Sequence, residues 1–373
     1  MNGIKLWFKK LNFKSILIIA LLIRLLLAPL SFHSDLNNNA IWGRYAQEFG
    51  LRGFYDWLNF GNYARPDYPP LAMIMFLLIR WIWQILFNLF WKLNITIGLF
   101  PSKFIPWFET SGYLFLIKLP GIFADLGIGY LIYKLIRKKN SEFTAKVASS
   151  LFLFNLPIIY LSSSWGQLDS IVTFFGLLTA IVLLNKKYFL AISSFFVSLM
   201  IKVTMIAATP IFIIQSLKNK ISIKKVLILA SVLIAYSLLL GNLYIDKAPL
   251  PWLITTYWKK FLPGAVTLPY LNLNAFNFWG LMFGLERLLD TTPFLGAPLS
   301  IWAWVISSVF FLLIIYKFWK GQNIFFSLLM IFFSAFMFLP LATIFDYEIV
   351  ERGLCFINLF IFSYILKVYL KEK

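Results

Sequence analysis

The stretch ILIIALLIRLLLAPLSFHSDLNNNA, residues 16–40, carries an apolar run directly into a polar segment. From Ile16 to Leu30 the run is interrupted only by Arg24, and then a histidine, an aspartate and three asparagines follow. A run of this kind is typical of a helix that crosses a membrane. The polar residues therefore lie where the helix emerges, at a point that both lipid and water can reach.

Composition extends this interpretation to the whole chain. Of its 373 residues, 61% are hydrophobic and 13% charged, and the mean hydropathy is +0.81. These values exclude a soluble globular protein. The formal net charge of +19 would suggest a nucleic-acid partner in a soluble protein. Here the basic residues cluster in short loops between apolar runs, as the positive-inside rule requires, and we expect no nucleic-acid partner.

Cysteine and histidine are too scarce for most metal sites. The chain has one of each, His33 and Cys355, which excludes an internal disulfide and a Cys/His metal centre. We assign no metal ligand, although carboxylates of the outer loops leave a divalent cation open as a cofactor. The basic N-terminus is followed by no small-residue cleavage site, so we interpret it as part of an uncleaved first helix.

The predicted fold class is an all-α polytopic membrane protein of about 10–12 transmembrane helices, in a single membrane domain over residues 1–373. Run length and flanking charge place the spans at about 15–32, 113–136, 144–161, 170–185, 188–201, 203–217, 226–245, 301–319, 324–345 and 354–369. Two large outer loops, about 33–70 and 246–300, remain, and we expect interfacial helices in the first.

The basic clusters fix the orientation and leave two ambiguities. Both termini are predicted to be cytoplasmic, with the acidic loops outside a prokaryotic plasma membrane. Residues 188–217 are expected to form two short spans that meet near Lys202, because one long helix would overshoot the bilayer. Residues 71–100 must cross an even number of times, as a hairpin of short helices, or lie partly in the interface.

Polar residues at the outer boundary are the candidate site, because such groups are rarely idle in a membrane protein. Asp35 opens the first outer loop, although an aspartate there can also simply cap the next helix. Asp67 and Tyr68 follow in RPDYPPLA, where the prolines also make a rigid turn. Gln167 and Asp169 close the stretch NLPIIYLSSSWGQLDS, residues 155–170.

Three further groups carry charges or amides. Lys118 and Asp125 lie two turns apart on one helix face inside a span, and a structural ion pair with other helices is a serious alternative there. Lys202 is placed to meet a phosphate, or merely snorkels to water. Asn274 and Asn277, between aromatic residues, suit a hydroxyl-rich ligand. Glu351 and Arg352 open the last span.

In order along the chain, these stretches resemble a known family. An acidic residue after the first helix, GLRGFYD, DYPPL, KLPGIFADL, WGQLDS, SLMIK and NAFNFWGL are similar to motifs of the GT-C superfamily of integral membrane glycosyltransferases. The nearest likeness is to prokaryotic relatives of the GPI-anchor mannosyltransferases. The resemblance covers about residues 30–355.

The resemblance implies transfer of a hexose, mannose or glucose-like, from a polyprenyl-phosphate sugar to a glycan, lipid or protein acceptor on the non-cytoplasmic face. Asp35 matches the family's catalytic base, which implies inversion at the sugar carbon. Asp67, Tyr68, Gln167 and Asp169 match its loop motifs, and Lys202 matches the lysine near the donor phosphate. One stretch departs from the family: IVERGL keeps Glu351 and Arg352 without the flanking His and Tyr.

A secondary transporter or lipid-linked-sugar flippase is the alternative from a different class. Charges within the spans line substrate paths in such proteins. Against it, the sequence shows no internal repeat, and transport alone would leave the Asn-rich outer loops without a role.

The predicted orientation has a direct test. Single cysteines placed in residues 33–56 or 277–298, in a Cys355→Ser background, should react with impermeant thiol reagents in intact cells. Cysteines at Lys186 or Lys187 should react only after permeabilisation, because basic loops face the cytoplasm. Labelling of position 186 or 187 in sealed cells would reverse the orientation.

Overall fold

The computed structural model describes residues 11–56, 60–264, 269–272 and 277–339. The predicted span at 354–369 lies outside these residues. The first half of the chain forms α2 (Phe13–Leu27), α3 (Ser34–Phe49), η1 (Phe54–Asp56), α4 (Pro70–Ile97), α5 (Phe104–Trp107), η2 (Phe108–Gly112), α6 (Tyr113–Arg137), α7 (Glu142–Leu153), α8 (Leu156–Ile159), η3 (Tyr160–Trp165) and α9 (Asp169–Leu184).

The second half continues the bundle and adds several short helices and strands. It comprises α10 (Tyr188–Ile201), η4 (Val203–Ala208), α11 (Thr209–Lys218), α12 (Ile223–Gly241), α13 (Pro249–Thr256), η5 (Tyr257–Phe261), α14 (Leu262–Gly264), β1 (Tyr270–Asn272), α15 (Phe278–Phe283), β2 (Leu288–Leu289), β3 (Pro293–Phe294), β4 (Ala297–Pro298), α16 (Leu299–Trp319) and α17 (Ile324–Phe338). The strands form two small antiparallel pairs, β1 with β2 and β3 with β4.

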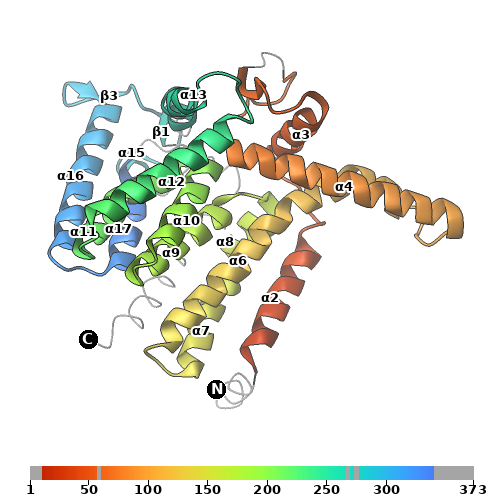
Figure 1. The fold of residues 1–373 in the computed structure, drawn as a ribbon, viewed down its shortest axis with the longest axis horizontal. Coiled ribbons are helices and arrows are strands. Elements are labelled where there is room, and N and C mark those ends of the chain that lie inside the picture. Colours follow the sequence, from red (N-terminus) through yellow and green to blue (C-terminus); the bar gives the residue numbers. More distant parts are fainter. Residues whose placement is uncertain (1–10, 57–59, 265–268, 273–276, 340–373) are drawn as a thin grey trace.

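The all-α class is confirmed, but fewer helices than predicted have the length of a span. Four segments in the described residues are long and apolar enough to cross a membrane: Pro70–Ile97, Phe104–Arg137, Ile223–Gly241 and Leu299–Trp319. A fifth candidate is broken, since Glu142–Leu153 and Leu156–Trp165 meet at an angle of 54°. The other predicted spans in this region are shorter helices. Of these, α2 and α9 pack against α6, α10 and α11 pack against α9, and α17 packs against α16 (Figure 1).

The break predicted near Lys202 is confirmed. Helix α10 ends at Ile201, Lys202 adopts an extended conformation with φ −153° and ψ 140°, and η4 starts at Val203. The predicted hairpin over residues 71–100 is wrong, because α4 is one continuous helix of 28 residues. Pro70 stands in its first turn, where the missing N–H of a proline costs nothing.

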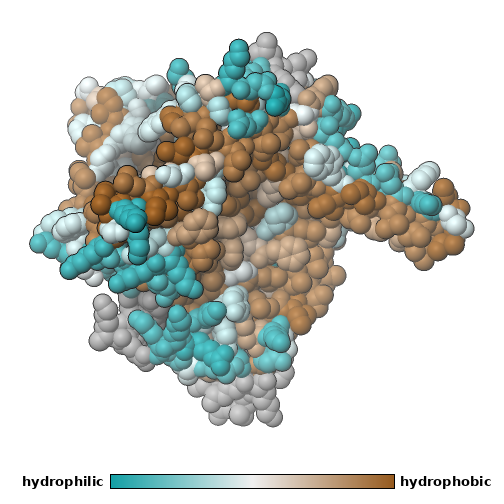
Figure 2. Space-filling view, in the orientation of Figure 1, coloured by the Kyte–Doolittle hydropathy of each residue, from teal (hydrophilic) through white to brown (hydrophobic). Residues whose placement is uncertain are grey.

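Helix α4 leaves the bundle and runs across the direction of α2 and α7 (Figure 1). Its far half carries hydrophilic residues along one side and hydrophobic residues along the other (Figure 2). Exposed apolar side chains on it include Trp81, Ile85, Leu89 and Trp91. A helix with a polar side and an apolar side, bearing tryptophans, suits the membrane interface, which was the other prediction for this segment.

Buried charged side chains join helix α2 to α6. Arg24 Nε donates to Asp125 Oδ2 over 3.0 Å, and its Nη1 donates to the Leu153 carbonyl over 2.9 Å. Lys118 Nζ donates to the carbonyls of Ala28, over 2.7 Å, and Ser31. Lys118 and Asp125 thus share a face of α6, as predicted, and both use that face to hold α2.

The Arg24–Asp125 pair predicts a specific pattern of stability. Arg24→Met leaves a buried carboxylate without its cation and should cost about 3–5 kcal/mol. The double variant Arg24→Met/Asp125→Leu should recover most of that loss, because it removes both charges. The measurement is the thermal unfolding midpoint of detergent-purified protein.

An exposed ion pair supplies the control for this experiment. Arg44→Met breaks the exposed contact between Arg44 and Glu48 and should change the midpoint little. If the double variant were as unstable as Arg24→Met, the loss would come from packing rather than from unpaired charge.

Candidate functional site

Two donors hold the side chain of Asp35. Trp165 Nε1 donates to Asp35 Oδ2 over 2.8 Å, and Gln167 Nε2 donates to the same oxygen over 3.1 Å. In the part of the chain that the structure describes, Oδ1 accepts no hydrogen bond. A carboxylate held through one oxygen keeps a fixed orientation and leaves the other oxygen available as a proton acceptor.

His33, rather than Asp35, caps helix α3. The Nδ1 atom of His33 accepts a hydrogen bond from the backbone N–H of Asp35 over 3.1 Å. An accepting nitrogen carries no proton, so this contact requires the neutral imidazole with its proton on Nε2. The ring of His33 also packs against Trp165, with 4.4 Å between the ring centroids. Helix capping was the alternative interpretation of Asp35, and in the structure His33 fills that role.

Further contacts join the other predicted residues to Asp35. Tyr68 Oη donates to Gln167 Oε1 over 3.5 Å, a long hydrogen bond. Lys202 Nζ contacts both carboxylate oxygens of Asp169, at 3.0 and 2.9 Å. The same ammonium lies 5.7 Å from the centre of the Tyr68 ring. Residues from four separate segments, Asp35, Tyr68, Gln167, Asp169 and Lys202, thus form one polar cluster.

Asp67 belongs to the same electrostatic environment. Burial raises the pKa of the Asp67 carboxyl above its usual value, the charge of Asp35 adds to the rise, and Lys202 opposes it. Burial also raises the pKa of the Tyr68 phenol to about 12. Tyr68 is therefore a neutral hydrogen-bonding group at pH 7, whereas Asp67 holds its proton to a higher pH than an exposed aspartate does.

Hydrogen bonds from α3 and η1 position the loop that carries Asp67 and Tyr68. Asn38 Oδ1 accepts from the Ala64 N–H over 3.1 Å, and Trp42 Nε1 donates to the Ala64 carbonyl over 2.8 Å. Tyr55 Oη donates to the Tyr68 carbonyl over 2.8 Å. Asn38, one of the three asparagines after the first helix, therefore holds the loop in place.

Gly166 lets Trp165 and Gln167 reach Asp35 together. Its φ of +79° lies in the left-handed region, and a Cβ there would come within 2.5 Å of Leu36 Cδ2 and 3.1 Å of Lys118 Cγ. The turn is therefore packed against both α3 and α6. Only glycine fits this combination of backbone conformation and close approach.

Other predicted residues lie apart from this cluster. Asn277 is buried, accepts from the Gly280 N–H and donates to the Leu271 carbonyl, so it caps α15. Lys118 and Asp125 hold α2, as described above. Asn274, Glu351 and Arg352 lie outside the described residues. Their assignment to the site stays a prediction.

Sequence reasoning missed the role of Trp165. In an apolar chain, a tryptophan at a helix end is typical of an interfacial anchor, yet its indole N–H is the shorter of the two bonds to Asp35. The sequence signal that could have identified this role is the order Trp165-Gly166-Gln167, in which a glycine separates two side chains with N–H donors. Two donors that flank a glycine can converge on one acceptor.

The described residues contain no group of three or more His, Cys, Asp or Glu side chains that could share a metal ion. No protein-family model matches this sequence, and no characterised protein matches it. The part of the chain that the structure describes is helical and contains four to five candidate membrane spans.

Gly166 provides a test of the cluster. Gly166→Ala places a methyl group in a left-handed residue, which costs about 1–2 kcal/mol, and it also displaces Leu36. We expect a lower thermal midpoint and a shifted fluorescence emission of Trp165, because the indole loses its fixed contact with Asp35. Gly61→Ala is the control, since Gly61 has a similar φ of +62° but nothing near its Cβ position. Equal effects of the two substitutions would mean that the turn at Gly166 is not packed as described.

Proposed function

We propose that the protein is a GT-C-type glycosyltransferase that moves a hexose from a polyprenyl-phosphate sugar to an acceptor on the non-cytoplasmic face of a membrane. The observation that carries the proposal is the carboxylate of Asp35. It is fixed through Oδ2 by Trp165 and Gln167, and no described residue donates a hydrogen bond to its Oδ1. A general base in a transfer reaction needs both properties.

The reaction assigns each group a place. Asp35 Oδ1 takes the proton from the acceptor hydroxyl as that oxygen forms a bond to the anomeric carbon of the sugar. The bond between this carbon and the phosphate oxygen breaks, and polyprenyl phosphate leaves with the electron pair. A single displacement of this kind inverts the anomeric carbon.

The leaving phosphate needs cations and hydrogen-bond donors. An ammonium has three N–H donors, and Lys202 directs its contacts to the two oxygens of Asp169. Asp169 is the acceptor that the described residues offer this ammonium, so one donor remains for a phosphate oxygen. Arg352, predicted at the same boundary, would supply a second cation. A bound divalent cation would serve the same purpose.

The positions of the family-like stretches support the proposal. Tyr68 comes from DYPPL, Gln167 from WGQLDS and Lys202 from SLMIK, stretches far apart in the sequence. Their side chains lie in one contact chain that ends at Asp35. If the resemblance were unrelated to a functional site, residues from these separate stretches would not be expected to lie in contact in the fold.

The alternative function, transport, is supported by fewer residues once the structure is considered. Lys118, Asp125 and Lys202 are the charges within the spans that suggested a substrate path. Asp125 accepts a hydrogen bond from Arg24, and Lys118 donates to carbonyls at the end of α2, so both join α2 to α6. Lys202 belongs to the polar cluster. The transport proposal therefore depends on the polar cluster alone.

Asp35→Asn tests the assignment of the base. The amide keeps the shape and the accepting oxygen but cannot take a proton, so release of polyprenyl phosphate should fall by about 10²–10⁴. Purified protein in nanodiscs is incubated with mannosyl- or glucosyl-phosphate polyprenols and a lipid extract as the acceptor source. Stabilisation of the protein by donor, seen as a higher thermal midpoint, should persist in the variant.

Glu48→Gln is the matched control, since Glu48 is an exposed carboxylate on the same helix. It should transfer at the wild-type rate. Near-normal transfer by well-folded Asp35→Asn protein would remove Asp35 as the base and move the assignment to Asp67 or Asp169. Wild-type protein that moves lipid-linked sugar across a bilayer without breaking it down would be a flippase.

A further inference from the structure

One nitrogen of His33 faces two parts of Asp35. Its Nδ1 atom accepts the hydrogen bond from the Asp35 backbone N–H over 3.1 Å, and the same atom lies 3.5 Å from Oδ2 of the Asp35 carboxylate. The side chain of His33 is 24% exposed, so a proton from solvent can reach it. This nitrogen therefore adjoins both the backbone that begins α3 and the carboxylate assigned as the base.

In the neutral imidazole, Nδ1 serves the backbone. A nitrogen that accepts the Asp35 N–H has no proton to donate to the carboxylate. Among the described residues, Oδ2 then accepts hydrogen bonds from Trp165 and Gln167, and both donors are uncharged. Neutral donors hold a carboxylate less strongly than charged ones do. Asp35 is thus oriented and still able to take a proton.

Protonation of His33 changes both contacts. An imidazolium carries an N–H on each nitrogen and accepts at neither, so the Asp35 N–H loses its partner and α3 loses its cap. The new Nδ1–H instead has Oδ2 as a charged acceptor 3.5 Å away. A small approach would form a charged hydrogen bond, which stabilises the carboxylate anion. Asp35 would then be a weaker base on a less firmly held helix turn.

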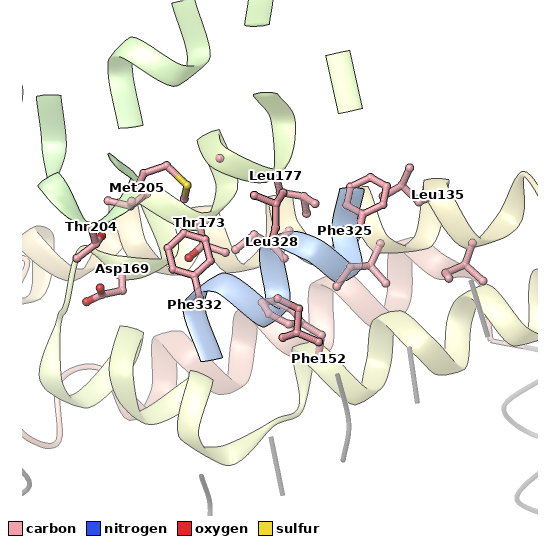
Figure 3. Close-up of a pocket in the computed structure, with 16 residues that line it drawn as sticks. Leu135, Phe152, Asp169, Thr173, Leu177, Thr204, Met205, Phe325, Leu328 and Phe332 are labelled. Atoms are coloured by element: carbon pink, nitrogen blue, oxygen red, sulfur yellow. The ribbon is translucent and has the colours of Figure 1, made fainter. Parts of the chain in front are cut away.

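Other titratable side chains lie around this pair. In the described part of the chain they include Lys118, Asp67, Tyr68, Tyr160, Asp169 and Lys202. Asp169 is also the one titratable residue among those that line an apolar cavity of about 500 Å³ (Figure 3). Burial raises the pKa of the Asp67 carboxyl, so its protonation would also affect transfer in acid. Asp67 is therefore the residue from which a role of His33 has to be distinguished.

We infer that His33 is a positioning residue that keeps Asp35 active only while its imidazole is neutral. The inference rests on the proposed function, because it assigns a role in the same reaction. His33 acts through the backbone and the carboxylate of Asp35. Imidazoles titrate at roughly pH 5–8, whereas exposed carboxylates titrate near about pH 4. Transfer should therefore be complete above the titration of His33 and fall as the pH drops through it.

The pH dependence of transfer tests this role. Asparagine caps a helix as well as any residue and does not titrate, so His33→Asn should keep kcat/KM within about threefold of wild type at about pH 8. Its acidic limb should lie lower than the wild-type limb by about one pH unit or more. An acidic limb that coincides with that of wild type would overturn the inference and assign the limb to Asp67.

Ser141→Ala is the matched control, because Ser141 caps α7 by accepting from the Thr144 N–H, as His33 caps α3. This variant loses a helix cap away from the polar cluster. It should lower the thermal midpoint and leave the acidic limb where it is in wild-type protein. A displaced limb in this variant would mean that loss of stability alone moves the profile, which would also overturn the inference.

The imidazole can also be followed without any transfer. His33 is the chain's single histidine, so nitrogen-15-histidine-labelled protein, purified through a histidine-free tag, gives one set of imidazole NMR signals. At about pH 8 these signals should show the proton on Nε2, and a proton on Nδ1 would overturn the inference. The signals should titrate together with the acidic limb. In Asp35→Asn protein they should titrate at lower pH, because the negative charge is gone.

The inference and the proposed function can fail separately. If the imidazole titration were unchanged in Asp35→Asn protein, the two side chains would not be coupled, and the inference would be overturned whether or not sugar is transferred. If the titration shifted as expected but the wild-type protein transferred no sugar, the proposed function would be defeated. The pairing of His33 with Asp35 would then remain.

Discussion

Burial of charge between α2 and α6 is the constraint on which the site depends. An unpaired cation inside a helical bundle is too costly to keep, so Arg24 must meet Asp125 and Lys118 must meet carbonyls at the end of α2. Pro29 follows the C-cap of α2 and ends the helix, and the second contact holds the carbonyls at that end. The turn that follows brings His33 and Asp35 to the end of η3, where Trp165 and Gln167 donate to the Asp35 carboxylate. Two buried charged contacts thus help to position this carboxylate.

The sequence predicted most helices because run length and charge are local signals. The boundary of α10 at Ile201 follows from a lysine between two apolar runs. The interruption of α7 and η3 was missed, since Pro157 lies in a run that is apolar enough to cross unbroken. The hairpin over residues 71–100 was wrong for a different reason. Charge parity favoured an even number of crossings, but it carries no information on whether the segment is one continuous helix or two.

The sequence singled out residues that the fold brings together, but it did not show which of them contact one another. Asp35, Tyr68, Gln167 and Lys202 were singled out because polar side chains at a membrane boundary need a reason to be there. Which of them touch is a property of packing, and it depends on Gly166, whose left-handed backbone nothing in the residue pattern specifies. Asn277 shows the opposite case. An amide between aromatic residues suggested a sugar contact. In the fold the oxygen of that amide caps α15, and its N–H donates to the Leu271 carbonyl.

The lengths of α9 and α10 have a consequence for the surrounding bilayer. With 16 and 14 residues, they measure about 24 and 21 Å, against a hydrocarbon thickness of about 30 Å. Helices of this length could cross a bilayer only where the membrane thins locally or where water enters above the helix ends. Asp169 starts α9 and Lys202 follows the last residue of α10, so a bilayer around these two helices would have to adapt at the polar cluster.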